Sequence, residues 1–136
     1  MSLAGKVGIL SRIGSLLGKR KQAPSFSDSH VQNAIEAWVA GRGYLLADRN
    51  PSQTAKRIGI TSAQLFSYCR EVKGEDFRTW RTHLRLEEAK KQLLAEPKVP
   101  ASVIARRVGI NDRSNFSRLF REYTGVLPSR WREENL

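Results

Sequence analysis

Residues 100–131, PASVIARRVGINDRSNFSRLFREYTGVLPSRW, decide the fold that this sequence predicts. A short helix is expected over 101–107, and Gly109 follows it where a turn needs a residue tolerant of positive φ. Asp112 is a good N-cap for a second helix over 113–123. Apolar side chains recur every third or fourth residue of that helix and predict one buried stripe. The stripe consists of Phe116, Leu119, Phe120 and Tyr123.

The opposite face of this second helix carries small polar and arginine side chains, which suit the floor of a DNA major groove. An arginine there can donate two hydrogen bonds to guanine, worth about 1–3 kcal/mol of discrimination against other bases. We predict base contacts from Arg113, Ser114, Asn115 and Arg118. For Arg113 and Arg118, contact with phosphate alone is the alternative, and a structural role is a second alternative for Arg118.

An earlier segment repeats this arrangement. Residues 54–60, TAKRIGI, match residues 104–110, IARRVGI, fifty positions later. Beyond the turn the matching positions lie fifty-one apart, so the second copy has one extra turn residue. Repetition of a whole two-helix segment predicts two helix-turn-helix units, over about 50–74 and 100–125, that address one face of DNA.

The first copy opens with a strong helix start. Asn50 is a good N-cap and Pro51 suits the first helical position, so this amino end is available to hold a phosphate. A second helix is expected over 62–72, and a helical-wheel count divides it into an apolar and a mixed face. Its inward residues are Leu65, Cys69 and Val72, with Tyr68 beside them.

The outward face of this helix is less polar than its counterpart in the second copy. A serine hydroxyl can meet any base, and Ala63 or Phe66 can touch a thymine methyl group. We predict base contacts from Ser62, Ala63, Phe66 and Ser67; the alternative is a solvated face that only positions the protein. The phosphate-contact candidates of both copies are Ser52, Arg70, Arg106, Arg107, Ser117 and Arg121.

A long helix over about 77–95 links the two copies. Its two halves carry apolar faces about 180° apart, so each half should pack on a different copy. The two sets are Phe77, Trp80 and Leu84, and Leu86, Ala89 and Leu93. At 1.5 Å per residue the helix is about 27 Å long, near the ~34 Å between successive major grooves. Arg85 lies at the changeover, and we interpret it as part of an internal charge pair rather than as a DNA contact.

Two further helices complete an all-α, seven-helix prediction with homeodomain-like helix-turn-helix subdomains. The first spans 28–40, and Leu45 and Leu46 should pack in the connector that follows it. The last spans 129–133, with Trp131 packed inward. The buried stripe of the first helix is Val31, Ala34, Ile35 and Trp38.

The second copy resembles the signature region of AraC/XylS-type transcription regulators, roughly I-A-x-x-V-G-F-x-D-x-S-Y-F-S-R-x-F-K-x-x-x-G-x-T-P-x-x-Y-R. The matching residues are Ile104, Ala105, Val108, Gly109, Asp112, Ser114, Phe116, Ser117, Arg118, Phe120, Gly125, Pro128 and Arg132. The departures are Ile110 for Phe, Asn115 for Tyr, Leu127 for Thr and Trp131 for Tyr. Because Asn115 sits beside the reading face, we expect its departure to alter specificity rather than fold.

The resemblance extends over about residues 28–133 and implies a function. It implies a bacterial regulator that binds specific sequences of double-stranded DNA, as an activator rather than a repressor, in the nucleoid of the cytoplasm. It also implies RNA polymerase as a candidate partner and requires no cofactor. We assign the double helix-turn-helix domain to residues 25–136.

Composition supports a polyanionic partner and gives little support to an enzyme. The net charge is +11 and the pI about 10.5, which favours nucleic acid first and an anionic membrane second. A single cysteine excludes an intramolecular disulfide, and His30 and His83 lack neighbours at metal-ligand spacing. The alternative function is a helical interaction module whose basic face binds a protein partner or an anionic membrane.

Residues 1–24 form a basic segment unlike the rest, with five positive charges, no acid and several glycines. One interpretation is a linker or tail, disordered or partly helical, that follows a missing sensor domain. A second is a basic surface or juxtamembrane helix, which would tether the parent chain to a membrane. A third is the start of a small complete protein.

Overall fold

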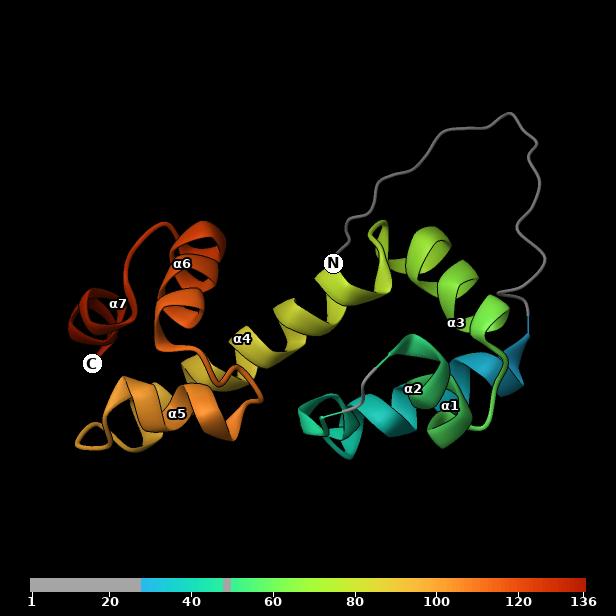
Figure 1. The fold of residues 1–136 in the computed structure, drawn as a ribbon, viewed down its shortest axis with the longest axis horizontal. Coiled ribbons are helices and arrows are strands. Elements are labelled where there is room, and N and C mark those ends of the chain that lie inside the picture. The colour runs from blue at the N-terminus through green and yellow to red at the C-terminus, as the bar shows by residue number, and fades with distance from the viewer. Residues whose placement is uncertain (1–27, 48–49) are drawn as a thin grey trace.

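The computed structural model describes residues 28–47 and 50–136, and these ranges contain seven α-helices and no strand (Figure 1). The chain is therefore all-α over these ranges, as the sequence predicts. The interpretations of residues 1–24 lie outside the described residues. The helices are α1 (Ser29–Ala40), α2 (Pro51–Ile58), α3 (Ser62–Tyr68), α4 (Phe77–Ala95), α5 (Ala101–Arg107), α6 (Arg113–Thr124) and α7 (Pro128–Asn135).

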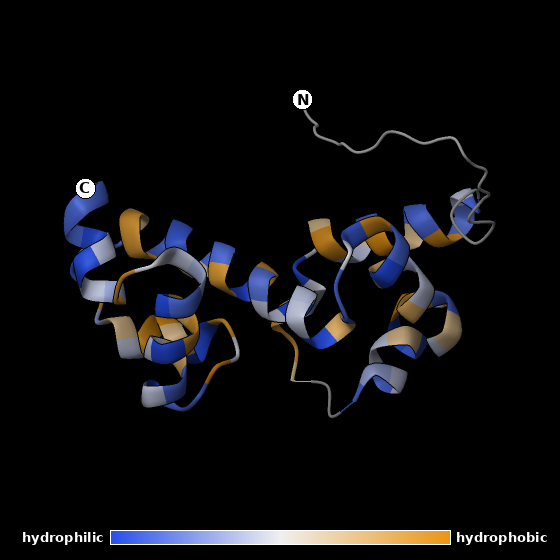
Figure 2. Ribbon diagram, turned by 90° about the horizontal axis from the view of Figure 1, so that it is seen from above, coloured by the Kyte–Doolittle hydropathy of each residue, from blue (hydrophilic) through white to orange (hydrophobic). Residues whose placement is uncertain are grey.

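Two separate hydrophobic cores lie on either side of α4, and hydrophobic residues recur in both halves of the molecule (Figure 2). The first core includes Phe77 and Trp80 from the start of α4, together with side chains from α1 and α3. The second includes Leu86 and Leu93, with side chains from α5 and α6. The predicted change of buried side along this helix is confirmed, so α4 joins two units.

The helix starts follow from side-chain caps that the sequence made visible. The side chains of Asp28, Asn50 and Asp112 accept hydrogen bonds from backbone amides of the first turns of α1, α2 and α6. At α3, Thr61 and Gln64 form a reciprocal capping box, which the sequence analysis did not include. These caps satisfy amides that would otherwise have no partner within the helix.

The two turns use glycine at equivalent positions, with φ of 95° at Gly59 and 88° at Gly109. Both values lie in the left-handed region, which glycine adopts without steric cost. The next helix is capped two residues later by Thr61 in the first unit and three residues later by Asp112 in the second. The extra turn residue predicted for the second copy is therefore confirmed.

Three predictions of burial are wrong. Val72 is 45% exposed, because α3 continues into a π-helical turn over Cys69–Lys73 that shifts the phase of the wheel. Tyr123 is 36% exposed, since its hydroxyl donates to the Glu87 carboxylate at 2.6 Å instead of being buried in the core. Leu46 is 47% exposed, and its backbone carbonyl rather than its side chain points inward.

The carboxyl-terminal helix closes the second unit. Trp131 packs against the second core and meets the ring of Phe120 edge to face at 5.8 Å, which confirms its inward position. Arg132 donates to the carbonyl oxygens of Leu93 at 2.9 Å and Glu96 at 3.3 Å. Arg132 thus satisfies carbonyl groups at the end of α4 that have no partner within that helix.

Candidate nucleic-acid interface

The two helices predicted to read DNA lie at opposite ends of α4. Figure 1 shows α3 near one end and α6 near the other, both in the upper half of the view, with α2 and α5 in the lower half. The 19 residues of α4 span about 28 Å at 1.5 Å per residue. That length is close to the ~34 Å repeat of the major groove, so one duplex can meet both helices.

On α3, the structure brings two classes of predicted contact together. Ser62 at its start lies beside Ser52 at the start of α2, with the two hydroxyl oxygens 3.2 Å apart. A phosphate-contact candidate therefore adjoins a base-reading candidate. Ala63 and Phe66 are exposed, and Ser67 is half-buried with its hydroxyl accepting from Arg70 at 3.4 Å. The outward face is the one that the helical wheel predicted.

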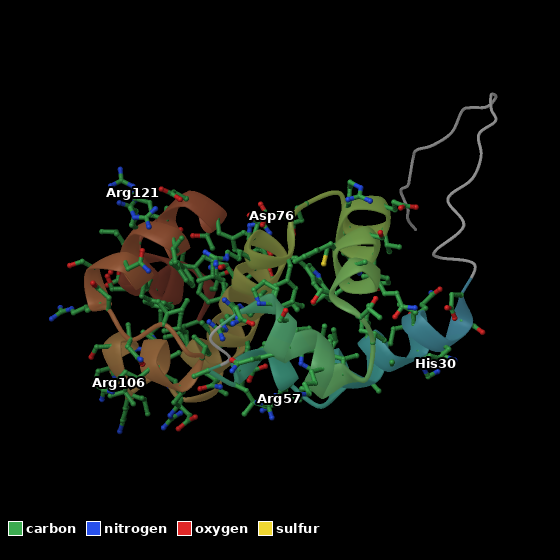
Figure 3. All side chains as sticks on the ribbon, turned by 45° about the vertical axis from the view of Figure 1, so that its right-hand side comes forward. His30, Arg57, Asp76, Arg106 and Arg121 are labelled. Carbon is green, nitrogen blue, oxygen red and sulfur yellow. The ribbon has the colours of Figure 1, made fainter. Side chains whose placement is uncertain are left out.

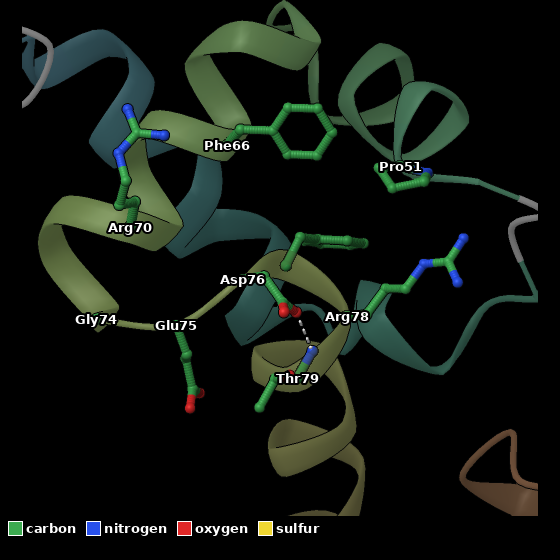
Figure 4. Close-up of a pocket in the computed structure, with 9 residues that line it drawn as sticks. Pro51, Phe66, Arg70, Gly74, Glu75, Asp76, Arg78 and Thr79 are labelled. Atoms are coloured by element: carbon green, nitrogen blue, oxygen red, sulfur yellow. Dashed lines mark hydrogen bonds between the residues drawn. The ribbon is translucent and has the colours of Figure 1, made fainter.

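An open groove of about 760 Å³ runs beside α3 (Figure 4). Phe66 and Arg70 line it from α3, and Pro51 lines it from the start of α2. Its remaining wall is residues 74–79, where the Asp76 carboxylate accepts from the Thr79 amide at 2.8 Å. That hydrogen bond lowers the pKa of Asp76, which is the N-cap of α4. The sequence analysis did not include this wall, because no local motif marks it.

On α6, the outward arginines are exposed but not equally available. Arg118 donates to the Asn115 side-chain oxygen at 2.5 Å and to Glu122 at 3.1 Å. An exposed pair of this spacing stabilises a helix by only about 0.3–0.5 kcal/mol, so a guanine can displace it. Arg113 and Ser114 are exposed in the first turn of the same helix, and Ser117 is half-buried.

The remaining cationic candidates do not gather at one place. Arg107 pairs with Glu96 at 2.7 Å, beside the end of α4. Figure 3 shows Arg57 and Arg106 along the lower edge of the molecule and Arg121 at its upper edge. The structure thus does not bring Arg106 and Arg121 together, and contact of both with one phosphate backbone stays a prediction.

Side chains that suggest other chemistry have structural surroundings. Cys69 is buried, and burial raises the pKa of its thiol to about 12, so it is not a nucleophile at neutral pH. His83 lies 3.1 Å from a Glu75 carboxylate oxygen and stacks on Tyr123. Over residues 28–47 and 50–136, no three potential metal ligands cluster, and no helix has the length and apolar character needed to cross a membrane.

A family described as a helix-turn-helix domain matches residues 54–134, more than half of the chain, and its relatives include regulators of AraC type. The chain belongs to the AraC-type helix-turn-helix family. The matched range includes both turn glycines, both reading helices and α4. The AraC-type family and its relatives are transcription regulators and not enzymes.

The relatives of this AraC-type chain are longer proteins. It is 33% identical over 89 residues to the arabinose operon regulatory protein of Escherichia coli strain K12, covering 64% of this chain and 30% of that protein. It is 30% identical over 137 residues to the uncharacterized transcriptional regulatory protein YesN of Bacillus subtilis strain 168, covering 95% and 36%. The chain thus spans about a third of the length of these relatives.

Solved structures share the AraC-type fold. The C-terminal domain of AraT, a response regulator from Geobacillus stearothermophilus, superimposes with a TM-score of 0.65 and 24% identity, covering 79% of this chain and 86% of that one. An AraC-type transcriptional regulator from Chromobacterium violaceum gives a TM-score of 0.66 and 20% identity, covering 81% and 95%. The seven-helix arrangement is therefore the one found in AraC-type DNA-binding domains.

Proposed function

We propose that this AraC-type domain binds a specific sequence of double-stranded DNA, with α3 and α6 in successive major grooves, and activates transcription. The observation that carries the proposal is the joining of two helix-turn-helix units by one continuous helix, with both exposed helices in the same half of the molecule (Figure 1). A net charge of +11 supplies the attraction to phosphate that such binding requires.

We assign the base-reading roles within this proposal to two groups of side chains. On α6, Arg113 and Arg118 are the guanine-reading candidates, and the Asn115 side chain determines how Arg118 is presented. On α3, the exposed Phe66 contributes an apolar contact instead. Phosphate contacts come from Ser52, Arg70, Arg106, Arg107, Ser117 and Arg121.

We also propose partners beyond DNA. The matched relatives are about three times longer than this chain, and a region that precedes the domain in the parent protein would carry the sensor. Activation further requires contact with RNA polymerase, which places the activity at the bacterial nucleoid.

The test is selection of binding sites from a pool of random 40-bp duplexes by immobilised protein, followed by gel-shift competition. We expect enrichment of a motif with two blocks of preferred bases about one helical turn apart. Affinity for that motif should fall steeply with salt, with a log–log slope of about −0.9 per phosphate contacted. An unenriched pool after repeated rounds would contradict the proposal.

Arg130→Ala provides a control for charge in the same assay. Arg130 pairs with Glu134 on α7, and its removal changes the net charge as much as the removal of Arg113 or Arg118. We expect Arg130→Ala to retain the preferred bases of the selected motif. Arg113→Ala or Arg118→Ala should relax a preferred base, and equal behaviour of all three variants would contradict the assigned reading roles.

A further inference from the structure

Arg85 is the one buried arginine among the described residues, and it lies on α4 between the two cores. Its Nε donates to the carbonyl oxygen of Tyr44 at 2.6 Å, and its Nη2 donates to that of Leu46 at 3.0 Å. Its Nη1 donates to the carbonyl oxygen of Gly109 at 3.4 Å. All three nitrogens of one planar group therefore bind backbone, and that backbone belongs to both helix-turn-helix units.

These three carbonyl groups belong to segments far apart in sequence. Tyr44 and Leu46 lie in the connector between α1 and α2, whereas Gly109 is the turn glycine of the second unit. Leu45, between the first two, packs against both hydrophobic cores. One turn along α4, the buried Glu88 carboxylate lies 3.5 Å from Arg42 of the same connector. The connector is thus held to α4 and to the second unit at several points.

Gly109 is required for this contact as well as for the turn. A Cβ atom at Gly109 would lie 3.1 Å from the guanidinium carbon of Arg85 and 3.3 Å from two of its nitrogens. The equivalent Gly59 has the same left-handed conformation, but a Cβ atom there would have nothing within 4 Å. The second turn is therefore shaped around Arg85, and the first is not.

We propose that Arg85 is a positioning residue that fixes the orientation of the two helix-turn-helix units and so sets the spacing of the half-sites the domain prefers. Long helices bend, and each core could roll about α4 if packing alone held it. A rigid fork of donors resists such rolling because movement of either unit leaves a buried carbonyl without its partner. The DNA part of this proposal rests on the proposed function, whereas the part about orientation does not.

The orientation part is tested by measuring distances between spin labels on the two units. Asn33→Cys and Glu133→Cys place labels on exposed positions of α1 and α7, and the buried Cys69 does not react. We expect Arg85→Gln to widen the distance distribution about twofold while the circular dichroism spectrum is retained. The control is Arg130→Gln, which makes the same chemical change on α7 and should keep the narrow distribution.

Arg85→Lys tests the same point if Arg85→Gln does not fold. A lysine keeps the charge but presents one ammonium group, which cannot meet three carbonyl oxygens in the geometry of the guanidinium fork. We expect its distribution to be wider than that of the unaltered domain and its half-site spacing preference to be weaker. An unaltered distribution in a folded Arg85 variant would overturn the proposal.

The DNA part is tested on duplexes selected by the unaltered domain, with one base pair added or removed between the two half-sites. The unaltered domain should lose on the order of tenfold in affinity for each change, because a rigid pair cannot engage both half-sites at the wrong spacing. Arg85→Gln should bind the original duplex more weakly but lose less than about threefold on the altered ones. Equal spacing penalties in both proteins would overturn this part. If the unaltered domain selects no duplex, the proposed function fails, and the distance distributions still decide the role of Arg85 in orientation.

Discussion

The two helix-turn-helix units share a sequence pattern but differ in what surrounds their turns. Gly59 and Gly109 adopt the same backbone conformation, yet only Gly109 adjoins another part of the protein, the guanidinium group of Arg85. The residues common to both copies are those that make a helix-turn-helix unit. The surroundings that differ show where one unit is joined to the other, and this joint lies at the second turn.

The reading helices differ as well. In the second unit α6 is α-helical throughout its 12 residues and carries exposed arginines. In the first unit α3 has seven α-helical residues before a π-helical turn, and its exposed face includes Ala63 and Phe66. We therefore expect α6 to contribute more to base discrimination and α3 to contribute more shape and apolar contact.

The largest difference between the units is expected in their cores. Phe120 and Cys69 occupy matching positions fifty-one residues apart, and both are fully buried. Phe120→Ala should lower the free energy of unfolding by about 3–5 kcal/mol, because it leaves a large cavity beside the rings of Phe116 and Trp131. Cys69→Ala should cost only about 1 kcal/mol. Urea denaturation measures both, and equal losses would contradict the assignment of aromatic packing to the second core.

The turn glycines give the next largest effect. Gly59→Ala should lower the free energy of unfolding by about 1–2 kcal/mol, because alanine is strained in the left-handed region. Gly109→Ala carries the same strain and also displaces Arg85, so its loss should be larger by about 1–2 kcal/mol. The two variants form a matched pair for chemical denaturation. Equal losses would show that the Arg85 contact contributes nothing at the second turn.

The reading faces should differ in binding rather than in stability. Arg118 and Ser67 are matching residues of α6 and α3. Arg118→Ala should reduce discrimination at one base pair by about 1–3 kcal/mol, and Ser67→Ala by less. Arg121→Ala should weaken binding to all sequences alike, because its predicted contact is to phosphate. Competition against single-base variants of the selected duplex measures each loss; uniform losses for Arg118→Ala would remove it from the base-reading set.

The smallest effect is expected where α6 meets α4. Burial raises the pKa of Glu87, but hydrogen bonds from Tyr123 and Lys90 outweigh burial and lower it overall. This pair therefore stabilises the fold above the unfolded pKa of Glu87, and the stabilisation is lost as pH falls through the folded pKa. Tyr123→Phe should raise the pKa of Glu87 in an NMR titration and cost at most about 0.5 kcal/mol at this exposed site. The matching residue in the first unit is the exposed Val72, and Val72→Ala should leave the Glu87 titration unchanged.

The features that could be predicted from sequence are those with local causes. Helix starts at Asn50 and Asp112 follow from side chains within three residues, and the turn at Gly109 follows from backbone freedom. The two faces of α4 follow from periodicity alone. For the same reason, the outward residues of α3 and α6 could be predicted, whereas their roles toward DNA stay predictions.

The features that could not be predicted depend on segments that meet only in the folded chain. The internal position of Arg85 was expected, but its partners lie 41, 39 and 24 residues away, and nothing near it in sequence marks them. The π-helical turn that exposes Val72 has no motif of its own. The pairing of Arg118 with Asn115 and Glu122 has the usual helical spacing, yet the wheel assigns such residues only to a face.

The measurement that tests the central claim most directly is the affinity of the unaltered domain for its selected duplex with five base pairs inserted between the half-sites. Such an insertion turns one half-site to the opposite face of the duplex, about half a helical turn away. If a single rigid body reads both grooves, affinity should fall to that of a duplex carrying one half-site alone. Retention of full affinity would show that the two units do not read neighbouring grooves together.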